Sequence, residues 1–408
     1  MGPAEVEAVW RIESARIVAS LTRFTGDFAL AEDAAQEAVA EALVSWPTNP
    51  PDSPAGWLMA TARRRAIDAI RRRAALKDRH ALLAIDAEFG AVLDEDVDPD
   101  RIDDDILALM FVSCHPVLSP EARVALTLRV VAGLTTEQIA RAFLVPVPTV
   151  QARITRAKKT IAAAGVPFEL PAANERRERL GGVLSVVYVI FTEGSTATSG
   201  DRLLRRDVAY EAIRLARTLA ALLPDEPEVH GLLALCELTA SRFPARTAPD
   251  GSPILLEDQD RQRWDFSAIR RGLAALVKAS PRGLGPYGLQ AAIAAAHATA
   301  PSVEATDWDQ IVLLYEALGR VAPSPVVELN RAVAVAMASG PAQALAMVDE
   351  LVALNRLPGS YLVPTVRGEL LTRLGRVAEA RAELELAARL CTNPQERSVL
   401  LHKAAALS

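Results

Sequence analysis

The residues whose types and spacing most clearly indicate ligand binding lie between positions 141 and 159, where five Lys or Arg residues occur without any Asp or Glu. Side chains that can donate hydrogen bonds to base edges or neutralise phosphates recur along this stretch: Thr149, Gln151, Arg153, Arg156 and Lys158. The pattern predicts an interface with the major groove of duplex DNA. The alternative is a helical hairpin whose charged face is merely solvated.

Two short helices must position this polar face. Thr135 and Gln138 have the spacing of a capping box at the start of the first helix. Leu134 and Ile139 have the spacing of a hydrophobic staple, and Pro148 suits the first turn of the second helix. The second helix would bury residues spaced by four, three and four, namely Val150, Ile154, Ala157 and Ile161. These signals favour a helix-turn-helix that binds DNA over a solvated hairpin.

A second basic segment spans residues 58–77 and begins beside an aromatic residue. The aromatic residue is Trp57. One charged stripe of the segment consists of Arg64, Asp68 and Arg71, and a neighbouring stripe consists of Arg65 and Arg72. An aromatic ring beside a row of arginines suits single-stranded DNA, because bases stack on the ring while guanidinium groups pair with phosphates. Taken alone, the pattern favours a solvated basic helix with Trp57 in the core.

The positions of the charged residues along the chain are more informative about its ligands than the net charge. The whole chain has a net charge of −6, which alone speaks against a nucleic-acid ligand. Residues 59–81, however, hold eight basic and two acidic residues, whereas residues 86–105 hold ten acidic residues and one Arg. Two basic patches that flank an acidic connector predict two binding domains joined by a mobile linker.

Three helices are expected to position the arginine-rich segment, at residues 6–24, 28–45 and about 55–82. The second of them has an apolar stripe of Ala31, Ala35, Val39 and Leu43. Its opposite side is polar and includes Asp33, Gln36 and Glu37. Shorter helices are expected at about 104–114 and 120–132.

The sequence from about residue 175 onward predicts roughly eleven amphipathic helices separated by Gly, Pro and Asp. Two similar segments begin at Gly340 and Gly375, and this interval of 35 residues is close to a tetratricopeptide unit. The segment 191–201 lacks the spacing of a phosphate-binding loop and is interpreted as a structural turn. The charged segment 255–264 is interpreted as a salt-bridged joint, with a contact surface as the alternative.

Several classes of protein are disfavoured by composition. The three cysteines are scattered, and neither they nor the five histidines have metal-ligand spacing, so we expect a reducing, cytoplasmic setting without a structural metal. No apolar run is long enough for a membrane span, and the N-terminus lacks the pattern of a secretory signal. No catalytic constellation can be argued from spacing, so we expect neither catalysis nor a cofactor.

Residues 10–82 resemble the promoter-melting domain of extracytoplasmic-function sigma factors of bacterial RNA polymerase, through GDFALAEDAAQEAVAEAL (26–43) and GWLMATARRRAIDAIRRR (56–73). Residues 118–164 resemble the second DNA-binding domain of the same family. The whole chain is similar to the subgroup with a long tetratricopeptide-like extension. The C-terminal segments behind that resemblance are VIFTEGSTATSGD (189–201), LLEDQDRQRW (255–264) and SPVVELNRAVAVAMASGP (324–341).

The resemblance implies a role for each matching residue. Asp33, Gln36 and Glu37 would contact the clamp helices of the polymerase large subunit. The loop 45–56 and the following helix would capture unstacked bases of the −10 element through Trp57, Arg63, Arg64, Asp68, Arg71 and Arg72. The −35 element would be read in duplex form by Thr149, Gln151, Arg153, Arg156 and Lys158. The implied partners are promoter DNA and core RNA polymerase, at its clamp and flap, with the acidic linker following the polymerase channel.

Two positions depart from the family pattern. The family usually has an aromatic residue where this chain has Val39, which thins the core. It usually has Asn where this chain has Arg64, and because Arg prefers guanine or phosphate, the details of base capture differ here.

We therefore expect an all-α protein with four parts. These are a promoter-melting and polymerase-binding domain (1–85), an acidic linker (86–105), a helix-turn-helix domain (106–170) and a tetratricopeptide-like extension (171–408). The expected function is that of an alternative sigma factor tuned by its extension, for which an intramolecular contact with the sigma domains is one route. A helix-turn-helix regulator with a fused sensor domain and a repeat scaffold are the alternatives.

Overall fold

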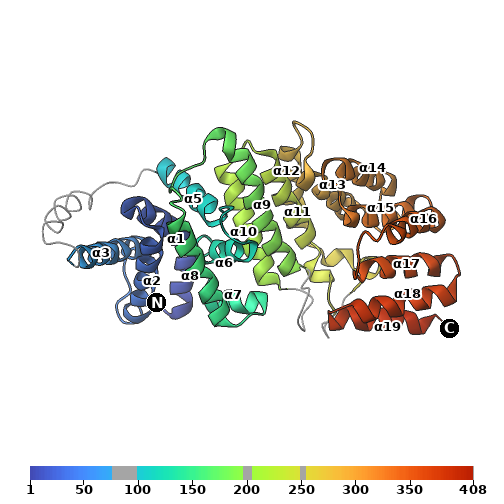
Figure 1. Cartoon of the computed structure of the whole chain (residues 1–408), viewed down its shortest axis with the longest axis horizontal. Coiled ribbons are helices and arrows are strands. Elements are labelled where there is room, and N and C mark those ends of the chain that lie inside the picture. The colour runs from blue at the N-terminus through green and yellow to red at the C-terminus, as the bar shows by residue number, and fades with distance from the viewer. Residues whose placement is uncertain (76–98, 196–204, 249–253, 408) are drawn as a thin grey trace. The chain divides into compact units, whose positions relative to one another are not determined.

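The computed structural model describes residues 1–75, 99–195, 205–248 and 254–407. Every regular element in these ranges is a helix, which confirms the all-α prediction (Figure 1). The chain falls into two compact units, Met1–Val189 and Ile190–Ser408, and each is described by itself.

The first unit begins with three helices that pack side by side, α1 (Pro3–Thr25), α2 (Phe28–Ser45) and α3 (Pro54–Ala75). Gly26 ends α1 in the left-handed region, with φ at +64°, and the Asp27 carboxylate then accepts a hydrogen bond of 3.0 Å from the Leu30 amide. The capping signals in the sequence thus set the bounds of α2, which match the prediction of 28–45. The expected end of α3 beyond residue 75 lies outside the described residues.

The predicted apolar stripe of α2 is wrong at Leu43, which is 43% exposed. The buried stripe is lined by small side chains, Ala31, Ala34, Ala35, Ala38 and Ala42. Because α2 packs against both α1 and α3, its buried face is broad, and alanines allow both neighbours to approach closely.

After residue 98, the described part of the first unit continues with α5 (Pro99–Ser113), α6 (Pro120–Val130), α7 (Thr136–Phe143) and α8 (Val147–Ala163). Because α5 begins at Pro99, residues 99–105, predicted as the end of the acidic linker, are helical instead. Proline at the first position and acidic residues in the first turns both stabilise a helix N-terminus. Asp105 is buried and pairs with Arg23 of α1. Residues 86–98 of the predicted linker lie outside the described residues.

The second unit consists of consecutive helices that pack on their neighbours in sequence, and α9 crosses its boundary. The helices are α9 (Ala173–Ser195), α10 (Arg206–Leu222), α11 (Pro227–Ala240), α12 (Phe266–Ala279), α13 (Pro286–Thr299), α14 (Trp308–Val321), α15 (Pro325–Ala338), α16 (Pro341–Ala353), α17 (Leu362–Arg373), α18 (Val377–Leu390) and α19 (Pro394–Ala406). The described residues between α11 and α12 include the short 3-10 turns η2 (Phe243–Ala245), η3 (Leu256–Asp258) and η4 (Arg261–Arg263). The helix-rich extension expected after residue 175 is therefore confirmed.

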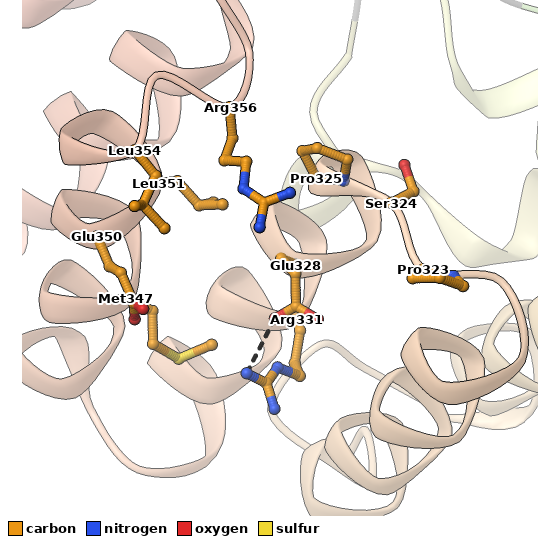
Figure 2. Close-up of a pocket in the computed structure, with 10 residues that line it drawn as sticks. All are labelled: Pro323, Ser324, Pro325, Glu328, Arg331, Met347, Glu350, Leu351, Leu354 and Arg356. Atoms are coloured by element: carbon orange, nitrogen blue, oxygen red, sulfur yellow. Dashed lines mark ion pairs between the residues drawn. The ribbon is translucent and has the colours of Figure 1, made fainter.

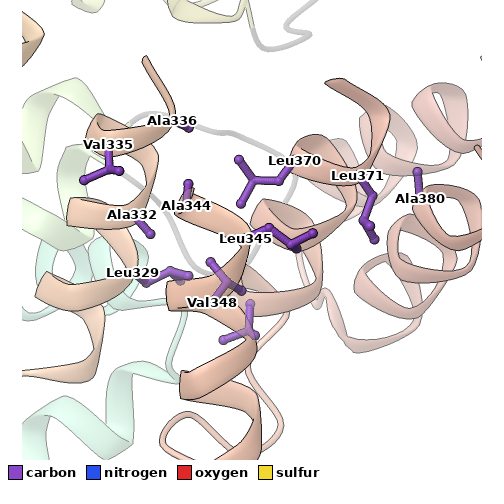
Figure 3. Packing of buried hydrophobic residues seen from close by; sticks show 11 residues of the cluster. Leu329, Ala332, Val335, Ala336, Ala344, Leu345, Val348, Leu370, Leu371 and Ala380 are labelled. Carbon is purple, nitrogen blue, oxygen red and sulfur yellow. The ribbon is translucent and has the colours of Figure 1, made fainter. Parts of the chain in front are cut away.

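A hydrophobic cluster joins the four helices α15 to α18 (Figure 3). Leu329 of α15, Val348 of α16 and Leu371 of α17 are almost fully buried in it. Gly340 and Gly375, both with positive φ, form the turns inside the helix pairs α15–α16 and α17–α18. The 35-residue interval thus corresponds to a recurring helix pair, whereas membership of the tetratricopeptide class stays a prediction.

Candidate nucleic-acid and polymerase interfaces

The start of α7 is fixed by the residues that the sequence indicated. The Gln138 amide donates to the Thr135 hydroxyl at 3.2 Å, and the Thr135 amide donates to the Gln138 side chain at 2.9 Å. Leu134 and Ile139 are buried, as a staple requires. Leu144 ends α7 with a φ of +50°, a left-handed conformation that costs free energy in a residue other than glycine. The predicted helix-turn-helix is therefore present.

Helix α8 has one buried and one polar face, as predicted. The buried face consists of Val150, Ile154, Ala157 and Ile161. Gln151 and Arg156 are exposed, and Thr149 and Arg153 are half-buried. These four of the five predicted duplex contacts thus keep at least part of their side chains in solvent.

Lys158, the fifth predicted duplex contact, pairs with carboxylates of α2 inside the first unit. Its Nζ atom lies 2.8 Å from Glu32 and 2.7 Å from Asp33, and its side chain is only 13% exposed. Burial opposes the charge, but the attraction of Glu32 and Asp33 outweighs it and raises the Lys158 pKa. The structure therefore brings together a predicted DNA contact and a predicted polymerase contact, Asp33.

Glu32 lies at the centre of this ion-pair group and is 3% exposed. Its second oxygen accepts a hydrogen bond of 3.0 Å from Arg129 of α6. A buried carboxylate needs such partners, since an unpaired charge away from water is costly. Glu32 and Arg129 were not among the predicted site residues, because an acid on an alanine-rich helix gives no sign of the partner that folds against it.

The start of α3 is organised by two tryptophans. The Trp57 ring is half-buried and meets the fully buried Trp46 ring edge to face, with centroids 5.5 Å apart. The Trp46 side chain fixes the position of Trp57 without covering it completely. Trp57 is thus partly in the core and partly accessible. The first property agrees with its interpretation as a core residue, and the second with its interpretation as a ring on which bases stack.

The arginines of α3 fall into two groups. Near the middle of the helix, Arg64 and Arg65 pair with Glu41 of α2 at 3.1 and 2.6 Å. Toward the end, Arg71 and Arg72 are exposed. Arg63 and Asp68 are half-buried. Arg64 is exposed as well, so exposed arginines lie both near the middle and toward the end of α3.

The remaining predicted polymerase contacts lie on the outer side of α2. Gln36 is half-buried, and the Glu37 side chain is 52% exposed. Glu37 also lies 3.9 Å from Arg65 of α3. Of the three residues, Asp33 alone is engaged by α8.

A pocket of about 400 Å³ lies in the second unit, between α15 and α16 (Figure 2). Arg331 on its wall pairs with Glu328 at 2.9 Å, so its charge is compensated. The rest of the wall mixes apolar and charged residues, such as Leu351 and Arg356. The pocket does not contain any residue of the predicted interfaces.

Within the described ranges, no group of His, Cys, Asp and Glu side chains is arranged to hold a metal ion. In the same ranges, no helix has the length and apolar character required to cross a membrane.

Comparison with known proteins agrees with this geometry. Residues 11–75 match the family model of sigma-70 region 2, and residues 108–161 match that of sigma-70 region 4. An uncharacterized protein of Rhizobium meliloti (strain 1021), R00370, is 46% identical over 386 residues, covering 93% of this chain and 90% of its own length. The chain belongs to the same family as this protein.

The two sigma-70 matches cover the two interfaces described above. They support a sigma factor, a DNA-binding protein of transcription initiation that binds RNA polymerase. Residues 179–280 match a family of unknown function (DUF6596), which leaves the tetratricopeptide-like prediction for the extension untested. No solved structure matches this sigma factor.

Proposed function

We propose that this protein is an alternative sigma factor of the extracytoplasmic-function type, which directs core RNA polymerase to a specific set of promoters in the cytoplasm. The observation that supports this best is the order of its parts. A region 2 match with exposed arginines beside a half-buried Trp57 precedes a region 4 match with an intact helix-turn-helix.

Each interface is assigned a role in this proposal. Trp57, Arg63, Arg64, Asp68, Arg71 and Arg72 capture the melted −10 element. Gln151 and Arg156, with Thr149, Arg153 and Lys158, bind the −35 duplex. Asp33, Gln36 and Glu37 bind the polymerase clamp, and the helix-turn-helix domain lies against the flap. The tetratricopeptide-like extension tunes these activities.

The pairing of Lys158 with α2 adds a condition to this proposal. The ion pairs to Glu32 and Asp33 must separate before Lys158 can reach a phosphate and Asp33 can reach the clamp. The first unit therefore opens when polymerase and promoter bind, and free sigma factor stays closed.

The decisive experiment is transcription from a promoter pool by core bacterial RNA polymerase, with and without the full chain. We expect specific initiation only with the protein, and its loss in both Arg71→Ala/Arg72→Ala and Arg153→Ala/Arg156→Ala variants. Arg177→Ala, a change to an exposed arginine outside both interfaces, is the matched control. Duplex binding without initiation would instead identify an ordinary helix-turn-helix regulator.

The role of the extension needs a separate comparison. Removing residues 175–408 should change promoter binding or transcription if the extension tunes activity. Unchanged binding and transcription would contradict that part of the proposal and leave the sigma function intact. Absence of any DNA binding, or binding with weak salt dependence, would favour a repeat scaffold.

A further inference from the structure

An unusual group of arginines surrounds the 3-10 turns between α11 and α12 in the second unit. Arg242 donates from Nε to the Gln259 side-chain oxygen at 3.3 Å. Arg246 donates to the Ser195 carbonyl at 2.9 Å. Arg261 donates to the carbonyls of His297 and Ala300, at 2.9 and 2.6 Å, where α13 ends. All these acceptors are neutral oxygens.

A single tryptophan holds two of these guanidinium groups close together. The buried Trp264 ring has the Cζ atom of Arg261 4.6 Å from its centroid and that of Arg242 5.6 Å from it. Cation–π attraction stabilises each arginine separately but does not cancel the repulsion between them. Burial, together with the charges of Arg246 and Arg261, lowers the pKa of Arg242 to about 10.

Among the described residues, the positive charge of this group has no close counter-charge. Within the described part of the chain, no carboxylate lies within 4.0 Å of the guanidinium nitrogens of Arg242, Arg246 or Arg261. Glu396 and Glu304 act on Arg246 and Arg261 only from a longer range. Elsewhere in the unit the opposite holds, since Arg271 lies 3.0 Å from the buried carboxylate of Glu237.

Three buried nitrogen atoms in this group also lack a hydrogen-bond partner among the described residues. They are Nη2 of Arg261, Nε1 of Trp264 and Nδ1 of His297. Burial, followed by the charges of Arg242 and Arg261, lowers the pKa of His297 to about 4, so its ring is neutral at pH 7. Nη2 of Arg261 and Nε1 of Trp264 are donors, and orphaned buried donors are rare in folded proteins because each has lost its hydrogen bonds to water.

We propose that Arg242, Arg261 and Trp264, with Arg246 and His297 beside them, form a binding site for a small oxyanion, best a phosphate group. An oxyanion supplies both the negative charge and the acceptor oxygens that these residues lack. The guanidinium groups already occupy the Trp264 ring, so recognition rests on the anionic group and not on stacking of an aromatic ligand. The site belongs to the extension and does not depend on the sigma function.

The test is a calorimetric titration of the full chain with inorganic phosphate, at constant ionic strength maintained with chloride. Acetate in a parallel titration provides the carboxylate form of the same chemistry. We expect saturable binding of phosphate and an accompanying rise in the melting temperature. Saturable binding of acetate alone would still support an oxyanion site, with a carboxylate as the recognised group. Absence of saturable binding of either anion to the wild type would overturn the proposal.

Variants locate the binding. Arg261→Gln should weaken phosphate binding roughly tenfold or more, because a charged hydrogen-bond donor is lost. Arg282→Gln, which changes an exposed arginine of the same unit, is the matched control and should bind as the wild type does. Arg153→Ala/Arg156→Ala removes phosphate binding by the DNA interface and should leave this site unaffected.

The same series of variants includes a control for correct folding. Arg261→Lys keeps the charge but loses the planar pair of donors, so it should fold and bind with intermediate affinity. Circular dichroism identifies variants that fail to fold. Equal phosphate binding by the wild type and a folded Arg261→Gln variant would overturn the assignment of the site.

Discussion

The ammonium group of Lys158 on α8 lies 2.8 Å from Glu32 and 2.7 Å from Asp33 on α2. Lys158 is proposed to bind promoter phosphate, and Asp33 is proposed to bind the polymerase clamp. While Lys158 and Asp33 are paired with each other, Lys158 is not available to promoter phosphate and Asp33 is not available to the polymerase clamp. In the proposed function, closure of the free protein and opening on polymerase are two states of one ion-pair group.

Weakening this group should favour the open state. Glu32→Gln removes the carboxylate shared by Lys158 and Arg129, so we expect tighter binding of duplex DNA and a steeper salt dependence. Each additional phosphate contact adds about 0.9 to the slope of log K against log salt. Fluorescence anisotropy with a labelled duplex measures both quantities. Glu178→Gln, an exposed acid on α9, is the matched control, and equal slopes for the two variants would contradict the closed state.

The polar face of α8 should determine affinity for duplex DNA. In Arg153→Ala/Arg156→Ala we expect the salt slope of duplex binding to fall by about 2, because two phosphate contacts are lost. Lys158→Ala should change the slope less than either single variant, Arg153→Ala or Arg156→Ala, since Lys158 is already paired in the free protein. A larger effect of Lys158→Ala would mean that its ion pairs are broken in solution.

Stability of the second unit should decrease in mild acid because of His297. Its pKa in the fold is about 4, below the ordinary value of 6.5, owing to burial and to Arg242 and Arg261. Between these pH values the unfolded chain binds the proton and the folded chain does not, so stability is lost as pH falls from 6.5 to 4. Linkage gives a loss of about 3 kcal/mol.

Urea unfolding of the wild type and of His297→Phe in phosphate-free buffers measures this dependence. Phenylalanine keeps a ring against Trp308, whose centroid lies 5.2 Å from that of His297, but cannot titrate. The variant should therefore show a flatter pH dependence. Parallel curves for the two proteins would show that other groups account for the acid sensitivity.

The crossing of α11 and α13 should depend on the absence of a side chain at Gly231. A Cβ atom there would lie 2.7 Å from the backbone nitrogen of Gly288. Gly231→Ala should therefore destabilise the fold by about 1–3 kcal/mol despite its better helix propensity. Gly181→Ala on α9 meets no atom within 4 Å and should instead be neutral or stabilising. Thermal unfolding of both variants tests the prediction, and equal shifts would contradict it.

The sequence by itself predicted the features that depend on residues close to one another along the chain. The bounds of α2, the capping box of Thr135 and Gln138, and the buried positions Val150 and Ile154 all follow from local hydrogen bonding or helical spacing. The recurring helix pairs around Gly340 and Gly375 were visible for the same reason. Local patterns fail where one helix meets two neighbours, as at the exposed Leu43.

Only the tertiary structure decided which charges meet. The pairing of Lys158 with Glu32 joins residues 126 positions apart, and nothing near either residue in the sequence indicates the other. The same holds for Arg261, whose carbonyl partners and uncompensated charge depend on how α13 packs beside the turn at η4. Electrostatic interactions act through space and depend on burial, so composition gives the charges but the fold determines their partners.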